Sequence, residues 1–355
     1  MTLSTQAGQS PIDATKGTPP RQVPFAEIAP LMRLADMLAP VAIRVAATLG
    51  LADHIVAGRT GVAELAEVTG THAPSLRRLL RFLHARGVFA ETADGEYQLT
   101  DLARPLRSGH PAGLRERFDL EGPVGRGDLS FIHLLDSIRT GKPSYATMYG
   151  RGFWEDLDGS PERAAAFARM QAANVSQAGI EDAYDWSGVR TVVDVGGGNG
   201  ALLARILLAN EHVHGTVVDL PSTVRGAEEN LVALGLAERC PVVAGSFFDP
   251  LPAGADVYLL SKILHDWDDD AAVRILRRCA EATGPRGKVL IAEIVPSGTE
   301  ADPSFTYLDL HMLVYFGGKE RTLPEFEELA GRAGLSVQRV LPAHWGNAVL
   351  ECVPR

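Results

Sequence analysis

The stretch VVDVGGGNGALLARIL, from Val192 to Leu207, decides the fold of this chain. It begins as a short apolar run, passes through a glycine-rich turn and continues with the spacing of a helix. Glycines permit positive φ and let a ligand approach the backbone closely, and the helix that follows offers free amide donors. The order strand, glycine turn, helix therefore predicts a ligand-binding crossover in an α/β fold.

The same alternation continues from this turn to the end of the chain. Apolar runs such as HGTVVDL, DVYLLSKIL and KVLIAEIV alternate with helical stretches such as STVRGAEENLVALG and DDAAVRILRRCAEATG. This pattern predicts βαβ units and a Rossmann-like, doubly wound, mostly parallel sheet over residues 186–355. The last two strand-like runs, SVQRVLP and NAVLECV, are so close that they predict an antiparallel hairpin at the edge of the sheet.

The first part of the chain follows a different pattern. Residues 1–24 are rich in Pro, Gly, Ser and Thr and are expected to form a flexible arm. Residues 25–105 combine helices, one of them ending at Leu49 before Gly50, with the hairpin-like run FAETADGEYQL, which indicates a winged-helix-like domain. Its wide apolar helix surface fits a subunit interface. Residues 106–185 are mostly helical and are expected to line a substrate site.

Composition excludes several classes of protein. The chain has 355 residues with 34 basic and 44 acidic side chains, so its net charge is −10, which argues against nucleic acid as the main ligand. No apolar run approaches the roughly 20 residues that a membrane span needs, and the N-terminus lacks the features of a secretory signal. The three cysteines are few and widely spaced, as expected for free thiols in a reducing, cytoplasmic compartment.

The glycine turn by itself leaves the cofactor open. Gly196 and Gly198, followed by Ala201, satisfy the dinucleotide fingerprint, and Asp219 stands where an acid would bind ribose hydroxyls in NAD or in S-adenosylmethionine. Asp194, just before the glycines, is badly placed for a pyrophosphate but well placed for a cationic ligand. This carboxylate favours S-adenosylmethionine, which carries an ammonium and a sulfonium and no phosphate.

Six motifs in order make a family resemblance specific. The stretches VVDVGGGNG, VVDLP, AGSFFDPLP, LLSKILHDWDDDAAVRILRRC, IAEIVP and GGKERTLPEFEELAGRAGL resemble the small-molecule O-methyltransferases of the plant caffeic acid type. The stretches VAIRVAATLGLADHI and YDWSGV resemble more closely the bacterial branch that decorates polyketide and anthracycline antibiotics. The resemblance covers nearly the whole chain after the arm. It implies a homodimer formed through the winged-helix-like domain, with S-adenosylmethionine converted to S-adenosylhomocysteine.

The resemblance also implies cofactor contacts. It assigns the methionine end of the cofactor to the turn at Gly196, the ribose to Asp219, and the adenine to Leu220 and Phe247, with a further contact at Ser261. One position departs from the family. Ser246 stands where the family usually has an Asp that meets the adenine amino group, and a hydroxyl bonds there without charge assistance, so weaker cofactor binding is expected.

His265 is the expected catalytic base. It follows an apolar strand at the carboxyl end of the sheet, where α/β proteins bind ligands. A phenol has a pKa near 10, so a neutral imidazole that takes its proton assists attack on a methyl group. The resemblance assigns Glu293 and Glu320 to orient the ring. The acids of DWDDD are read as the start of a helix rather than as a metal cluster, so no metal requirement is expected.

The substrate wall is predicted from position and resemblance together. A flat pocket that tolerates aromatic rings is expected from these residues: Phe153, Met170, Asn174, Asp266, His311, Met312 and Tyr315. The expected reaction is metal-independent methyl transfer to a hydroxyl of an aromatic, polyketide-like natural product.

Three alternatives stay open at this point. Some antibiotic-pathway relatives hydroxylate or decarboxylate; we associate them with loss of the HDW histidine, which this chain retains. A DNA-binding regulator would use the arginines of the winged helix, but the acidic net charge argues against it. An NAD-dependent dehydrogenase is distinguished directly by measuring which cofactor binds.

Overall fold

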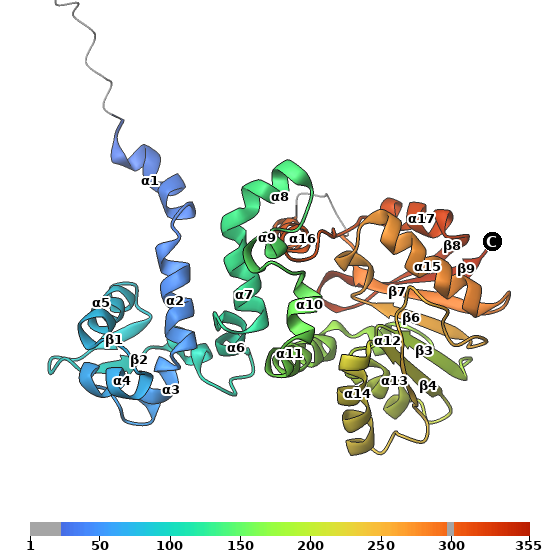
Figure 1. Ribbon diagram of the computed structural model, residues 1–355, viewed down its shortest axis with the longest axis horizontal. Coiled ribbons are helices and arrows are strands. Elements are labelled where there is room, and N and C mark those ends of the chain that lie inside the picture. The colour runs from blue at the N-terminus through green and yellow to red at the C-terminus, as the bar shows by residue number, and fades with distance from the viewer. Residues whose placement is uncertain (1–22, 297–301) are drawn as a thin grey trace, which may run out of the picture.

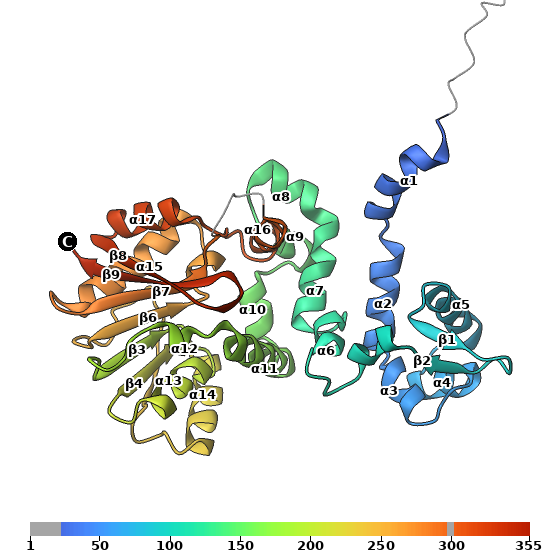
Figure 2. The same cartoon turned by 180° about the vertical axis from the view of Figure 1, so that it is seen from behind.

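A computed structural model describes residues 23–296 and 302–355, without the side chains of residues 172–177. The predicted arm thus lies almost entirely outside the described residues. Figures 1 and 2 show an N-terminal helical unit, a middle layer of helices and a C-terminal α/β unit arranged in a row. Among the described helices, none has both the length and the apolar character to cross a bilayer. The three cysteines are free and buried.

The N-terminal unit confirms the predicted order of helices followed by a hairpin. Its elements are α1 (Phe25–Leu34), α2 (Leu38–Thr48), α3 (Leu51–Val56), α4 (Val62–Thr69), α5 (Ala73–His84), β1 (Phe89–Glu91) and β2 (Tyr97–Leu99). Gly50 adopts a φ of +60° between α2 and α3, a conformation that ends α2 at the predicted place. Leu51, Leu80 and Tyr97 lie at the centre of a small core of its own.

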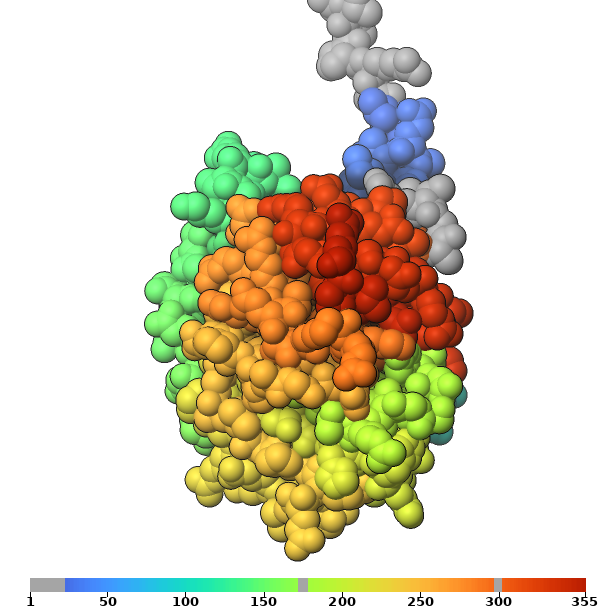
Figure 3. Space-filling view, turned by 90° about the vertical axis from the view of Figure 1, so that its right-hand side faces the viewer, coloured from blue at the N-terminus to red at the C-terminus, as the bar shows by residue number. Residues whose placement is uncertain are grey.

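One face of this unit has no apolar partner within the described chain. Phe25, Leu31 and Leu34 of α1 are 68%, 72% and 85% exposed, and Met37 and Leu38 continue the exposed surface into α2. Figure 3 shows α1 projecting beyond the outline of the α/β unit. A contiguous apolar face of this kind is typical of a protein–protein interface.

The middle layer is helical and also contains a helix from later in the chain. It comprises α6 (Leu114–Phe118), α7 (Pro123–Leu129), η2 (Ser130–His133), α8 (Leu134–Thr140), α9 (Ser144–Tyr149), α10 (Phe153–Asp158) and α11 (Pro161–Ala178). Before it, η1 (Asp101–Leu106) packs into the core of the N-terminal unit, and after it, α12 (Ile180–Ala183) packs into the core of the α/β unit. Helix α16 (Pro303–Tyr315) packs against α8 and α9. The Tyr315 hydroxyl oxygen lies 3.0 Å from the Val124 carbonyl oxygen, a contact that joins α16 to α7.

The α/β unit is built on a seven-stranded sheet. Its elements are β3 (Thr191–Val195), α13 (Ala201–Ala209), β4 (His214–Asp219), α14 (Pro221–Ala233), β5 (Val242–Ala244), β6 (Val257–Ser261), η3 (Leu264–Asp266), α15 (Asp269–Thr283), β7 (Lys288–Ile294), α17 (Leu323–Arg332), β8 (Leu335–Pro342), η4 (His344–Gly346) and β9 (Asn347–Pro354). The strand order is β5-β4-β3-β6-β7-β9-β8. Strands β3 to β7 pair in parallel, and β9 pairs antiparallel with β7 and β8. The mostly parallel sheet and its edge hairpin are confirmed.

The topology places the glycine turn and the histidine next to each other. The chain moves outward from β3 to β4 and β5, then returns to β6 on the other side of β3. A ligand crevice forms at such a reversal, outside the carboxyl ends of the strands. Gly196 follows β3 and His265 follows β6, so neighbouring parallel strands deliver both to this edge.

Candidate functional site

The glycine turn is crowded on one side and open on the other. Gly196 has a φ of +74°, and a Cβ atom there would lie 2.5 Å from Ile263 Cδ1 and 3.3 Å from Phe247 Cε1. A larger residue would therefore be both strained and in collision. Gly198 has a φ of +59°, but nothing lies within 4 Å of its Cβ position. The turn packs against the segments after β5 and β6 and leaves backbone accessible at Gly198.

Two carboxyl groups frame this turn. Asp219, at the end of β4, accepts the Gly198 amide at 2.8 Å and the Leu220 amide at 2.7 Å. Asp194 is 2% exposed, and its Oδ2 is buried without a hydrogen-bond partner in the described part of the chain. Burial, together with the charge of Asp219, raises the pKa of Asp194 to about 7. An unpaired buried carboxyl group is costly, so this site suits a cationic ligand group.

The remaining predicted cofactor residues lie around the same edge. Ser246 Oγ accepts the Phe248 amide at 3.2 Å, and the Phe247 ring packs edge-on against Trp267 with 5.7 Å between centroids. Leu220 is 45% exposed, and Ser261 is the last residue of β6. The structure thus brings the predicted cofactor set to one edge of the sheet, while each residue's contact with a ligand stays a prediction.

His265 lies among three acids from different elements. Its Nδ1 is 2.9 Å from Glu320 Oε1 and 3.8 Å from Glu293 Oε2, and its Nε2 is 3.5 Å from Asp266 Oδ1. Glu293 comes from β7, and its Oε1 accepts the amides of Ile263 and Leu264. Both acids that the resemblance assigned to the ring are beside it, and the shortest contact is at Nδ1, while Nε2 faces Asp266.

These acids dominate the electrostatics of the ring. Burial alone lowers the pKa of His265, but the charges of Glu293, Asp266 and Glu320 outweigh it and raise the pKa to about 10. Burial raises the pKa of Asp266 to about 7 although His265 opposes this shift. Burial also acts to raise the pKa of Glu320, but His265 reverses the balance and holds it below its usual value. The imidazolium–Glu320 ion pair is therefore the stable form of this pair near neutral pH.

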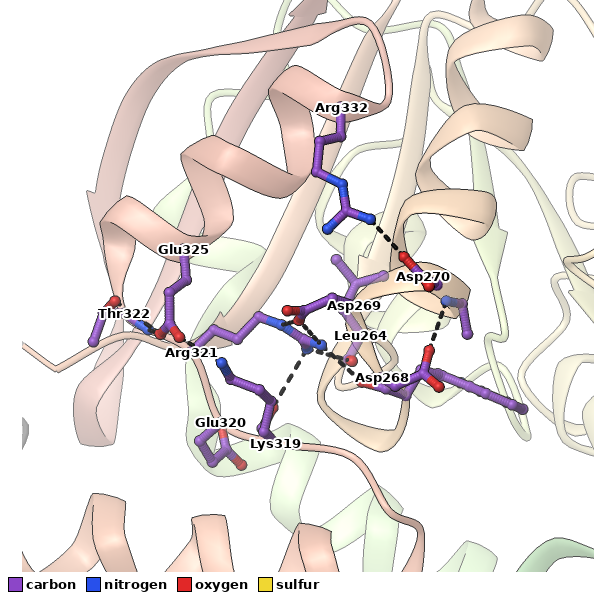
Figure 4. A network of polar contacts seen from close by, with 12 residues as sticks. Leu264, Asp268, Asp269, Asp270, Lys319, Glu320, Arg321, Thr322, Glu325 and Arg332 are labelled. Atoms are coloured by element: carbon purple, nitrogen blue, oxygen red, sulfur yellow. Dashed lines mark hydrogen bonds and ion pairs between the residues drawn. The ribbon is translucent and has the colours of Figure 1, made fainter. Parts of the chain in front are cut away.

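A buried arginine fixes the loop that carries the histidine. Arg321 is fully buried and donates to the carbonyl oxygens of Leu264 and Trp267, each at 2.7 Å, and to Asp269 at 2.8 Å (Figure 4). A Cβ atom at Gly318 would lie 2.1 Å from the His265 carbonyl oxygen. The GGKER segment thus holds the HDW segment in place through these hydrogen bonds and this close packing. Sequence reasoning missed Arg321, although it stands within the GGKER motif.

The acids after Trp267 have separate partners, as expected for the start of a helix. Asp268 caps α15 by accepting the Ala271 amide at 2.8 Å. Asp269 bonds Arg321, and Asp270 bonds Arg332 at 2.6 Å (Figure 4). Within the ranges that the structure covers, no group of three or more His, Cys, Asp or Glu residues is arranged to hold a metal ion. Metal independence itself stays a prediction.

The predicted substrate residues fall mainly in the helical layer. Phe153 and Tyr315 are buried and stacked with 5.7 Å between ring centroids, and the Tyr315 hydroxyl donates to Asp128 at 2.5 Å. His311 Nδ1 donates to the Tyr307 carbonyl oxygen at 2.8 Å, as its Nε2 faces Asp128. Three further predicted substrate residues lie in this layer: Met312, buried on α16; Met170, partly buried on α11; and Asn174, whose side chain lies outside the described residues. Asp266 lies instead beside His265. These contacts pack the layer, and substrate binding by its residues stays a prediction.

Family models match two regions of the chain. A model of the O-methyltransferase domain matches residues 131–336. A model of the O-methyltransferase dimerisation domain matches residues 32–108. The second match covers the winged-helix-like unit with the exposed apolar face, and the first covers the glycine turn, His265 and its acids.

Individual relatives are similar over nearly their full length. The chain is 50% identical over 321 residues to the 2,7-dihydroxy-5-methyl-1-naphthoate 7-O-methyltransferase of Streptomyces carzinostaticus, covering 90% of this chain and 96% of that protein. It is 45% identical to the aclacinomycin 10-hydroxylase of Streptomyces purpurascens, covering 86% and 84%. A crystal structure of an O-methyltransferase from neocarzinostatin biosynthesis, in complex with S-adenosylmethionine and 2-hydroxy-5-methyl naphthoic acid, superposes with a TM-score of 0.88 at 48% identity, covering 92% and 98%.

Proposed function

This chain belongs to the O-methyltransferase family with a dimerisation domain, and we propose that it methylates a hydroxyl group of an aromatic, polyketide-like compound with S-adenosylmethionine as the donor. The observation that carries the proposal is the contact between His265 Nδ1 and Glu320, which would leave the lone pair on Nε2, 3.5 Å from Asp266 Oδ1, to receive the proton of the acceptor hydroxyl. A naphthoate O-methyltransferase that is 50% identical over 90% of the chain supports the acceptor class.

The residues at the glycine turn fit the cofactor. S-adenosylmethionine supplies a methyl group on a positively charged sulfur. Asp194 offers a buried, unpaired carboxyl oxygen to the ammonium of its methionine end. Asp219 retains acceptor capacity for ribose hydroxyls, and open space at Gly198 leaves room for a ligand against the backbone. Phe247, Leu220, Ser246 and Ser261 would bind the adenosine part from the neighbouring loops.

His265 takes the proton of the acceptor hydroxyl in this mechanism. When the ring is neutral, Nδ1–H donates to Glu320 and the lone pair is on Nε2, where a phenol proton is received. The pKa of His265, about 10, lies close to that of a phenol, so the proton transfer is nearly balanced. Glu320 and Glu293 then stabilise the imidazolium, much as the carboxylate of a hydrolytic triad does. The hydrogen bonds of Arg321 to Leu264 and Trp267 hold the loop that carries the ring in place.

We also propose that the chain forms a homodimer. A second copy of the chain covers the apolar face of α1 and α2, which gives a cytoplasmic homodimer that needs neither nucleic acid nor membrane. No metal takes part: full activity is expected in excess chelator, and activity restored only by magnesium would contradict this.

Product stoichiometry tests the proposed reaction. Purified protein is mixed with S-adenosylmethionine and hydroxylated polycyclic aromatics, and S-adenosylhomocysteine and product mass are followed together. Equal amounts of both, with one methylene gained by the acceptor, are expected. A product that gains oxygen without S-adenosylhomocysteine would instead place the chain with its 45% identical hydroxylase relative.

A further inference from the structure

An ion pair joins the N-terminal unit to the helical layer. The guanidinium of Arg44 on α2 binds the carboxylate of Asp128 on α7, and the two side chains are only 19% and 10% exposed. One turn further along α2, the Thr48 hydroxyl oxygen accepts the Leu120 amide at 2.8 Å. Helix α2 carries part of the exposed apolar face, and it thus also holds the segment that leads into α7.

The same carboxylate also binds helix α16. Asp128 Oδ1 accepts the Tyr315 hydroxyl at 2.5 Å and lies 3.5 Å from His311 Nε2. Its other oxygen, Oδ2, binds Arg44. Burial alone raises the pKa of Asp128, but hydrogen bonds from these three side chains outweigh it and lower the pKa to about 2. Asp128 is therefore ionised at neutral pH and has a partner on each oxygen.

Helix α16 lies very close to α7 at this point. A Cβ atom at Gly127 would lie 2.2 Å from Tyr315 Cζ, so the ring packs directly on the backbone of α7. The Tyr315 ring also stacks on Phe153, and the His311 ring lies edge-on to Phe131 with 4.7 Å between centroids. These contacts leave little freedom for two of the side chains that are predicted to face the acceptor.

Helix α16 also holds the loop that carries Glu320. The Asp309 carboxylate on α16 accepts the Glu320 amide at 3.0 Å. Where the helix ends, the amides of Gly317 and Gly318 donate to the Met312 carbonyl oxygen at 3.0 Å and 3.2 Å. One helix therefore connects the predicted acceptor wall with the carboxylate beside the proposed base.

We propose that Arg44 is a positioning residue for the acceptor. Its bond to Asp128 fixes Tyr315 and His311, so that the N-terminal unit sets the shape of the acceptor site. The inference rests on the proposed methyl transfer, and Arg44 touches neither the acceptor nor the reacting atoms in this account. Loss of water offsets much of the attraction in a mostly buried ion pair, which favours orientation over stability as its role.

Acceptor kinetics of Arg44→Met test this role. With a phenol that wild type methylates, KM for the acceptor should rise about tenfold. KM for S-adenosylmethionine and the mass of the assembly by light scattering should stay constant. Arg44→Lys should recover part of the acceptor affinity, because a single nitrogen of Arg44 contacts Asp128. An unchanged acceptor KM, or equal losses for both substrates, would overturn the proposal.

A double-mutant cycle separates positioning from a loss of fold. Asp128→Asn should raise the acceptor KM to a similar extent, and Arg44→Met/Asp128→Asn should be no worse, because the two residues act as one unit. The double variant removes the buried charge and takes the place of Arg44→Met if that variant does not fold. Arg104→Met is the matched control: Arg104 pairs with the exposed Asp101, and its loss should leave the acceptor KM unchanged. Additive increases from Arg44 and Asp128 would contradict the proposal.

An NMR measurement needs no acceptor and keeps this inference separate from the proposed function. In protein with ¹³C-labelled histidine, the His311 ring signal is identified by its loss in His311→Gln. It should shift in Arg44→Met and keep its position in Arg104→Met. A wild type that transfers no methyl group would reject the proposed function, whereas an unmoved His311 signal in Arg44→Met would reject this inference alone.

Discussion

His265 illustrates how three carboxylates change one imidazole. An isolated histidine has a pKa near 6.5, whereas the acids around His265 raise its pKa to about 10 in spite of burial. The proposed base is thus matched to a phenol, but only a small fraction of the imidazole is neutral near pH 7. Methyl transfer should therefore become faster as the pH rises toward 10.

The same shift makes stability depend on pH. The pKa of His265 is higher in the folded state, so its contribution is fully present below pH 6.5 and is lost as the pH rises through about 10. The free energy of unfolding of wild type minus that of His265→Gln should fall by more than about 1 kcal/mol over this range. Denaturant titrations at pH 6 and pH 10 measure it, and a constant or rising difference would contradict the assignment.

Asp194 should make cofactor binding depend on pH. Its pKa is raised to about 7, so the carboxyl is mostly neutral at pH 5.5 and mostly ionised at pH 8. Because the ionised form binds an ammonium, affinity for S-adenosylhomocysteine should rise by up to about 30-fold between these values. Calorimetry of Asp194→Asn should give weak binding without this rise. The exposed Glu211→Gln variant serves as control, and an unchanged pH dependence in Asp194→Asn would reject the role.

Some of these residues were predictable and others were not. His265, Glu293 and Glu320 follow from motifs, and the structure brings them together although Glu320 is 55 positions from the histidine. Lys262 looks like an ordinary strand residue in DVYLLSKIL. Its side-chain nitrogen is nevertheless buried, without a hydrogen-bond partner in the described chain, and spacing along one strand does not show this.

At the level of elements, the GGKER loop and the HDW loop act as one unit. A Cβ atom at Gly318 would overlap the His265 backbone, and α15 begins where Arg321 binds Asp269. The two loops are far apart in the sequence and meet where Gly318 lies against the His265 backbone and Arg321 donates to the carbonyl oxygens of Leu264 and Trp267. The position of the ring thus depends on Gly318 and on the side chains of Arg321 and Glu320, and not only on its own short 3₁₀ turn.

Gly318→Ala tests this unit. The added methyl group forces the two loops apart, which should lower the free energy of unfolding by about 1–3 kcal/mol and reduce kcat more than cofactor affinity. Gly188→Ala is the matched control, because nothing lies within 4 Å of its Cβ position. Thermal unfolding and single-turnover kinetics report the two effects. Wild-type kinetics in Gly318→Ala would show that the close approach does not position the ring.

Local sequence patterns predicted most of the helices and strands, but not all of the contacts between elements that are far apart in the sequence. The hairpin at Asp94 and Gly95 and the edge strands β8 and β9 were predicted from turn residues and spacing, and are present. Strand β6 ends at Ser261, earlier than its apolar run suggested, because Lys262 has a positive φ. Helix α16 joins helices from much earlier in the chain through Tyr315, a long-range contact that no local pattern shows.

At the scale of the whole molecule, the proposed homodimer buries the apolar face of α1 and α2. The double variant Leu31→Asp/Leu34→Asp places charges on this face, and the protein should become a monomer by light scattering with its α/β unit still folded. Leu208→Asp introduces a charge at an exposed leucine of α13 and should leave the assembly unchanged. A double variant that remains dimeric would place the interface elsewhere.

The central claim, that His265 accepts the proton of the acceptor hydroxyl, is tested most directly by the single-turnover rate of methyl transfer as a function of pH. Wild type and His265→Gln are compared with saturating S-adenosylmethionine and one accepted phenol. We predict a wild-type rate that rises from pH 7 toward pH 10, and a variant that binds cofactor normally but is roughly 10²–10⁴-fold slower at neutral pH. A variant as fast as wild type would contradict the account.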